Sequence, residues 1–152
     1  MIALRTDGTT RVVLAVGPLA FKIARGAAGR RCNLFEARCY RTELEANRRL
    51  LCPVLACMKS GRILIMRAAR PLTQEEQRDL LRREAFPEWE YVPHTEGAPF
   101  EYKASDWGWL GNRLVALDYS SHALFSNEEK QALFEEALRR QEAEDKPSRP
   151  EL

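Results

Sequence analysis

Residues 100–119 constrain the fold of this 152-residue chain more than any other segment. A Gly-Asn pair at positions 111 and 112 predicts a turn, and the apolar run at 114–117 that follows predicts a strand. The resulting short hairpin has Asp106 before it and Asp118 after it, with Lys103 nearby. Two carboxylates and a lysine on neighbouring loops could hold a cation and a phosphate.

Composition and charge narrow the class of protein. The chain is 45% hydrophobic and 30% charged, which predicts one soluble globular domain with a modest core. Its 24 basic and 22 acidic residues give a net charge of +2, so bulk electrostatics do not call for a nucleic-acid partner. No apolar run is as long as a membrane span, and the first residues lack a signal-peptide pattern. We therefore expect an intracellular, cytoplasmic protein without a membrane partner.

Four cysteines raise the question of a metal site: Cys32, Cys39, Cys52 and Cys57. Their spacings of 7, 13 and 5 residues match no common zinc motif, and the two histidines are distant in sequence. We expect reduced, partly buried thiols that hold no metal.

The first 25 residues predict an antiparallel meander. Apolar runs at 2–4, 11–16 and 19–24 are separated by turn dipeptides, Asp-Gly at 7–8 and Gly-Pro at 17–18. Lys22 lies in the third run, where it is either an outward-facing charge or a functional cation.

A single long helix is expected after this meander. Residues 26–31 predict a flexible basic loop, and the helix is expected from about Asn33, which can cap it, to residue 51. Glu36 and Glu43 are seven residues apart and so share one face of that helix. Either glutamate could reach Lys22 if the helix packs on the sheet, and the other would be solvated.

Two further strands and two further helices are predicted. Apolar runs at 54–58 and 63–66 flank a turn and form a hairpin. Thr73 with Glu76 is a capping box that opens a helix, and Ser126 with Glu129 is a second capping box.

Three further segments complete the chain. The second capping box predicts an amphipathic helix at 127–143. Residues 86–99 contain three prolines and predict an irregular connection. The charged tail at 145–152 is expected to be disordered.

Taken in order, these elements resemble the protein kinase family. The run Leu-Ala-Phe-Lys ending at Lys22 is similar to the kinase strand whose lysine holds the α- and β-phosphates of the nucleotide. Met66 resembles the gatekeeper, although an apolar strand end explains it equally well. The backbone of Arg67, Ala68 and Ala69 would then be the hinge that faces an adenine.

The segment at 100–119 continues the resemblance. Glu101, Lys103 and Asp106 stand in the register of the kinase catalytic loop Asp-x-Lys-x-x-Asn, and Asp118-Tyr-Ser stands in that of Asp-Phe-Gly. The resemblance implies catalytic roles for Glu101 and Lys103, metal ligation by Asp106 and Asp118, and ATP and Mg²⁺ as cofactors.

The same resemblance gives the glutamate partner of Lys22 two candidates. Glu43 stands ten residues before Pro53, a spacing that many kinases show, whereas the surroundings of Glu36 are more similar to aminoglycoside-kinase-like and phage-encoded members. We expect an α+β, kinase-like fold. Its N-lobe (1–70) would hold a five-stranded antiparallel sheet with one packing helix, followed by a minimal helical C-lobe (71–144) and a tail (145–152).

Departures from the kinase pattern shape the expected function. The Gly-Pro turn at 17–18 is too short to close over a triphosphate, and Glu101 replaces the catalytic aspartate. The segment after residue 120 is too short for an activation segment with a helical platform that docks a peptide substrate. We therefore expect a truncated, degenerate, pseudokinase-like module that engages a partner protein with little or no phosphotransfer.

Two alternatives remain at this point. The first is a small ATP-dependent phosphotransferase that uses Lys22, Asp106 and Asp118 with a metal, and a phage protein that acts on a host factor is conceivable in either class. The second is nucleic-acid binding through a local basic patch around Tyr40, which a solvated arginine-rich helix face also explains. The patch comprises Arg25, Arg30, Arg31, Arg38, Arg41, Arg48 and Arg49.

Overall fold

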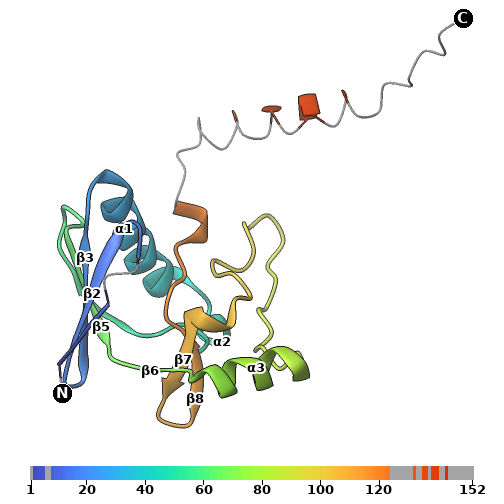
Figure 1. Ribbon diagram of the computed structural model, residues 1–152. Coiled ribbons are helices and arrows are strands. Elements are labelled where there is room, and N and C mark those ends of the chain that lie inside the picture. The colour runs from blue at the N-terminus through green and yellow to red at the C-terminus, as the bar shows by residue number, and fades with distance from the viewer. Residues whose placement is uncertain are drawn as a thin grey trace, which may run out of the picture.

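The computed structural model describes residues 2–5 and 8–123, together with residues 132, 135, 136, 138–140 and 143. The fold is α+β: a five-stranded antiparallel sheet with a helix on one face is followed by a smaller part built from a helix and a three-stranded sheet (Figure 1). Among the described residues, no helix is both long and apolar enough to cross a membrane.

The five-stranded sheet is the predicted meander joined to the predicted hairpin. Its strands are β1 (Ile2–Arg5), β2 (Arg11–Val16), β3 (Leu19–Ala24), β4 (Val54–Cys57) and β5 (Ile63–Arg67), arranged in the order β1-β2-β3-β5-β4. Every pairing is antiparallel. Gly17 turns the chain between β2 and β3 with a φ of 56°, a left-handed conformation that glycine adopts without steric cost.

The register of this sheet gives its two faces opposite characters. Cross-strand partners lie on the same face, so each row of partners belongs to one side. The inner rows carry the charged side chains: Arg5 and Lys22 share a row with Val13, and Arg11 pairs with Ala24. The outer face carries Ile2, Leu4, Val12, Leu14, Val16, Leu19, Phe21, Ile23, Ala56, Ile63 and Ile65, with Arg67 at one end.

The helix that covers the inner face begins earlier than predicted. It is α1 (Ala27–Thr42), and a short helix, α2 (Glu45–Arg48), follows it after a break. The expected flexible loop at 26–31 is therefore wrong, because the segment forms the first turns of α1 and Gly29 allows it to pack closely. A Cβ at Gly29 would lie 2.2 Å from the carbonyl oxygen of Thr10. The chain leaves the helix at Glu43, whose ψ of 154° is extended.

The part after residue 70 contains more strand than expected. α3 (Gln74–Arg83) starts with the predicted capping box, in which Thr73 accepts from the Glu76 N–H. However, β6 (Arg70–Pro71) joins the two strands of the predicted hairpin, β7 (Trp107–Leu110) and β8 (Arg113–Ala116), in a three-stranded sheet, so the description of this part as a helical lobe is incomplete. Residues 86–99 are irregular, as predicted. The helix predicted at 127–143 lies mostly, and the tail at 145–152 wholly, outside the described residues.

Backbone hydrogen bonds tie the β7–β8 hairpin to the chain that follows α2. The N–H of Cys52 donates to the carbonyl oxygen of Ala116 at 3.0 Å, and the Ala116 N–H donates to Leu50 at 2.7 Å. The Tyr119 hydroxyl donates to the Cys52 carbonyl oxygen at 2.8 Å, and its side chain is fully buried. These contacts fix the end of β8 and the residues after it against the segment between α2 and β4.

Candidate ligand-binding cleft

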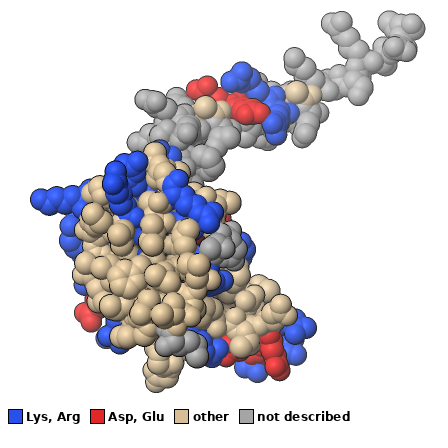
Figure 2. Space-filling view, turned by 60° about the vertical axis from the view of Figure 1, so that its left-hand side comes forward, with Lys and Arg blue, Asp and Glu red and all other residues tan. Residues whose placement is uncertain are grey.

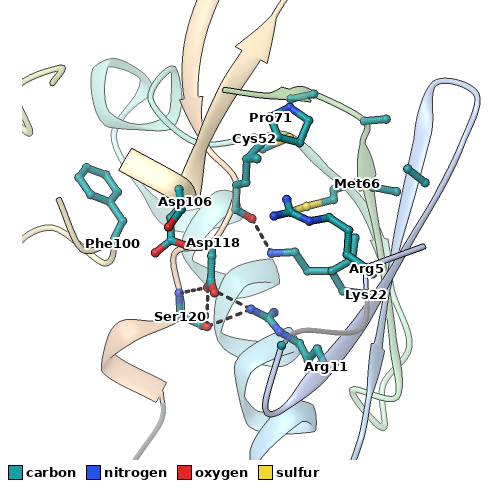
Figure 3. Close-up of a pocket in the computed structure, with 18 of the residues that line it drawn as sticks. Arg5, Arg11, Lys22, Cys52, Met66, Pro71, Phe100, Asp106, Asp118 and Ser120 are labelled. Carbon is teal, nitrogen blue, oxygen red and sulfur yellow. Dashed lines mark hydrogen bonds and ion pairs between the residues drawn. The ribbon is translucent and has the colours of Figure 1, made fainter. Parts of the chain in front are cut away.

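A cavity of about 520 Å³ lies between the inner face of the five-stranded sheet and the segments that flank the β7–β8 hairpin (Figure 3). This volume is typical of small-molecule sites. One end is lined by apolar side chains, which include Val13, Ala20 and Met66. The other end is lined by charged ones: Arg5, Arg11, Lys22, Glu101, Lys103, Asp106 and Asp118.

Glu36 is the centre of the charged network behind this cavity. Its side chain is completely buried, and Lys22 Nζ donates to its two carboxylate oxygens at 3.0 and 2.9 Å. Arg11 donates to the same two oxygens at 2.8 and 3.1 Å. The structure therefore places Glu36 beside Lys22, and Glu43, at the end of α1, is not its partner.

Arg11 joins this buried pair to Asp118. Its Nη2 donates to Asp118 Oδ1 at 3.0 Å and to the Ser120 hydroxyl at 3.1 Å. The Ser120 hydroxyl in turn donates to Asp118 Oδ1 at 2.9 Å. Arg11 is 6% exposed, whereas half of the Asp118 side chain faces the cleft. Arg11, Lys22, Glu36 and Asp118 form a group of two cations and two carboxylates whose formal charges cancel.

Asp106 and Asp118 interact across the open end of the hairpin, as predicted. The Leu117 N–H donates to the carbonyl oxygen of Asp106 at 2.7 Å, which holds the two loops together. Partial burial is the largest effect that raises the pKa of Asp106, and the negative charge of Asp118 raises it further. Burial also acts to raise the pKa of Asp118, but Lys22 and Arg11 hold it well below its usual range.

The two aspartates make a poor site for the Mg²⁺ that the resemblance implies. Among residues 2–5, 8–123 and the later described positions, no three His, Cys, Asp or Glu side chains gather as metal ligands do. Asp118 Oδ1 already accepts from a guanidinium, whose permanent charge opposes a second cation at that oxygen. The contact with Arg11 therefore disfavours a divalent cation bound through Asp118 Oδ1.

The apolar end of the cleft contains the proposed gatekeeper and hinge. Met66 lies on the inner face and is 2% exposed. The N–H of Arg67 donates to Pro53 and that of Ala68 donates to Pro18, so two hinge donors are already used. Ala69 lines the cavity, and its N–H has no backbone partner within the described part of the chain.

The connection that faces the cleft is the one between β1 and β2, not the Gly-Pro turn at 17–18. Gly8, Thr9 and Thr10 line the cavity, whereas Pro18 lies against Ala68 at the hinge. The prediction that the Gly-Pro turn at 17–18 is the segment that would close over a phosphate is therefore wrong. Residues 8–10 have the position for that role.

The two residues aligned with the kinase catalytic loop also line the cavity. Glu101 and Lys103 are both exposed at its charged end. Lys103 lowers the pKa of Asp106, opposing the larger effects of burial and Asp118.

Sequence reasoning missed Arg5, Arg11 and Ser120. Arg11 is two residues before Val13, which pairs with Lys22, so strand alternation already places Arg11 and Lys22 on one face. Arg5 follows from the same alternation, since it pairs with Val13. Nothing in the sequence singles out Ser120, which acts through its hydrogen bonds to Arg11 and Asp118.

No family model, curated protein or solved structure matches this chain. The class that the structure defines is an α+β protein with a charged cleft between its two sheets.

Proposed function

We propose that this chain is a pseudokinase-like binding module. Its cleft is organised by ion pairs and transfers little or no phosphate, and the outer face of its five-stranded sheet engages a partner protein.

The composition of the outer sheet face carries this proposal. An antiparallel sheet with one solvated face ordinarily turns polar side chains outward. Here the outward side chains are nearly all apolar, and the charged Arg5, Arg11 and Lys22 lie on the covered face instead. Ile2 is 73% exposed and Leu4 is 62% exposed. Figure 2 shows this face as a broad uncharged area with basic side chains gathered at its upper end. Exposed apolar patches of this extent mark interaction surfaces.

The size of the face suits the core of an interface. Five strands at about 4.8 Å spacing and five residues at about 3.3 Å rise span roughly 400 Å². A standard interface buries about 800 Å² on each partner, with an apolar centre and a polar rim. The sheet face would supply the centre, and Arg67 with the basic residues at its upper end would contribute to the rim.

The charged network disfavours phosphate transfer. Lys22 has three N–H donors, and all three are used on Glu36 and the Leu117 carbonyl oxygen. Glu101 has one methylene more than the catalytic aspartate of the kinase loop. Its carboxylate would therefore be displaced by about an ångström, which is enough to disrupt a positioned catalytic base. Asp118 is neutralised by Arg11 before any ligand arrives.

A second candidate, a small phosphotransferase, is favoured by two observations. Asp106 and Asp118 are neighbours in the cleft, and the segment with Gly8, Thr9 and Thr10 faces it. The two candidates differ in whether the purified chain turns over ATP and whether Asp118 is required for that turnover.

A photo-crosslinking amino acid placed at Leu14, which lies between Leu4 and Phe21 on the outer face, tests partner binding in cells. We expect one adduct of defined mass, and it should persist in Asp118→Asn. The same probe at Arg78, on the exposed surface of α3, is the matched control and should give no such adduct. Equal crosslinking from both positions, or none from Leu14, would contradict the proposal.

A further inference from the structure

The guanidinium of Arg11 occupies the part of the cleft where a cation would balance the carboxylates. It lies within hydrogen-bond distance of both Glu36 oxygens, of Asp118 Oδ1 and of Ser120. It is held in this position by Asn33, whose side-chain oxygen accepts from Arg11 Nη1 at 3.1 Å. The Asn33 amide nitrogen donates to the carbonyl oxygens of Lys22 and Gly61. Arg11 is thus a fixed part of the fold rather than a mobile surface side chain.

We propose that Arg11 replaces a divalent cation in this cleft, and that the cleft binds a phosphate-bearing ligand without metal. The ion group of Arg11, Lys22, Glu36 and Asp118 has no net formal charge, so Glu36 and Asp118 are balanced without a metal. The proposal goes beyond the proposed function, because the partner surface lies on the opposite face of the sheet and does not require a ligand in the cleft.

Two other cations are available to contact the phosphates. Arg5 lines the cavity, and Figure 3 shows its side chain reaching into it beside Met66 and above Lys22. Within the described part of the chain, the Arg5 side chain has no hydrogen bond or ion pair. Lys103 also lines the cavity, and Thr9 and Thr10 add hydroxyl groups. The apolar end, with Val13 and Ala20, would take the non-polar part of the ligand.

The test is calorimetric titration of the full chain with ATP and with inorganic triphosphate, each in excess EDTA and again with Mg²⁺. We expect both probes to bind in EDTA, with ATP the tighter of the two, and Mg²⁺ to leave both affinities unchanged or weaker. Arg5→Gln should weaken binding of both probes in EDTA by about tenfold, the effect of one charge-assisted contact. Arg82→Gln, which removes an exposed arginine of α3, should have no effect.

Binding that appears only with Mg²⁺, or no binding in EDTA, would overturn the proposal. Arg11→Gln should convert the cleft to metal dependence: weaker binding in EDTA that Mg²⁺ restores. Because that variant removes a buried charge and can fail to fold, Mn²⁺ titration of the unaltered chain followed by paramagnetic resonance gives an independent result. We expect no tight Mn²⁺ site, and a stoichiometric site that disappears in Asp118→Asn would also overturn the proposal. A failure here leaves the crosslinking result at Leu14 unaffected.

Discussion

Glu36→Gln should destabilise the fold more than any other exchange of one glutamate for glutamine. The side chain keeps its size, but the buried negative charge between Arg11 and Lys22 is lost. Five hydrogen bonds converge on the two oxygens of Glu36, four from the two cations and one from the Tyr119 N–H at 3.1 Å. In the variant, two buried cations face each other, with only the partly exposed Asp118 to balance them.

Removing one member of a buried ion pair costs about 3–5 kcal/mol, because the remaining charge is left without compensation. A domain of this size has a free energy of unfolding of about 5–15 kcal/mol, so this single change would remove much of it. The expected fall in melting temperature is about 2–4 °C for each kcal/mol.

Urea unfolding followed by circular dichroism would measure the change in the free energy of unfolding. The dependence of that free energy on urea concentration should be the same in the variant and the unaltered chain. A double-mutant cycle with Lys22→Met isolates the pair: the two losses should be less than additive by about 0.5–3 kcal/mol for Glu36. Glu43→Gln, at the end of the same helix, is the matched control and should be additive with Lys22→Met. Equal and additive losses for Glu36 and Glu43 would refute the reasoning.

Three further predictions follow from single residues. The lowered pKa of Asp118 stabilises the fold above about 3.9, the value in an unfolded chain, and this contribution is lost as the pH falls toward the folded-state pKa. The urea midpoint should therefore fall more steeply below about pH 5 in the unaltered chain than in Asp118→Asn, and equal slopes would contradict this. Gly29→Ala should cost about 1–3 kcal/mol through overpacking against Thr10, and an unchanged midpoint would show that the contact can relax. Burial raises the pKa of Cys39 to about 12, so iodoacetamide should label it far more slowly in the native state than in urea.

The sheet was predictable because its signals are local. Turn dipeptides separate the apolar runs, and the capping box at Thr73 and Glu76 marks the start of α3 within four residues of sequence. The start of α1 was not predictable in this way. The glycine-rich segment at 26–31 suggests a loop until Gly29 is seen against Thr10, a contact between residues nineteen positions apart.

The site was predictable in its residue types more than in its pairings. Lys22, Asp106 and Asp118 lie in the cleft as expected, but the choice between Glu36 and Glu43 depended on where the helix ends. Arg11 was missed because only the strand register brings it to Glu36, 25 positions away. The same register decides that the connection after β1, rather than the turn at 17–18, faces the cavity.

Phosphate release and phosphate transfer from ATP, measured on the purified chain with Mg²⁺ or Mn²⁺, test the central claim most directly. If ion pairs have replaced the catalytic metal, the unaltered chain and Asp118→Asn should both be indistinguishable from buffer, and both should keep the same crosslinked adduct at Leu14. ATP turnover by the unaltered chain that disappears in Asp118→Asn, with the fold intact, would contradict the account.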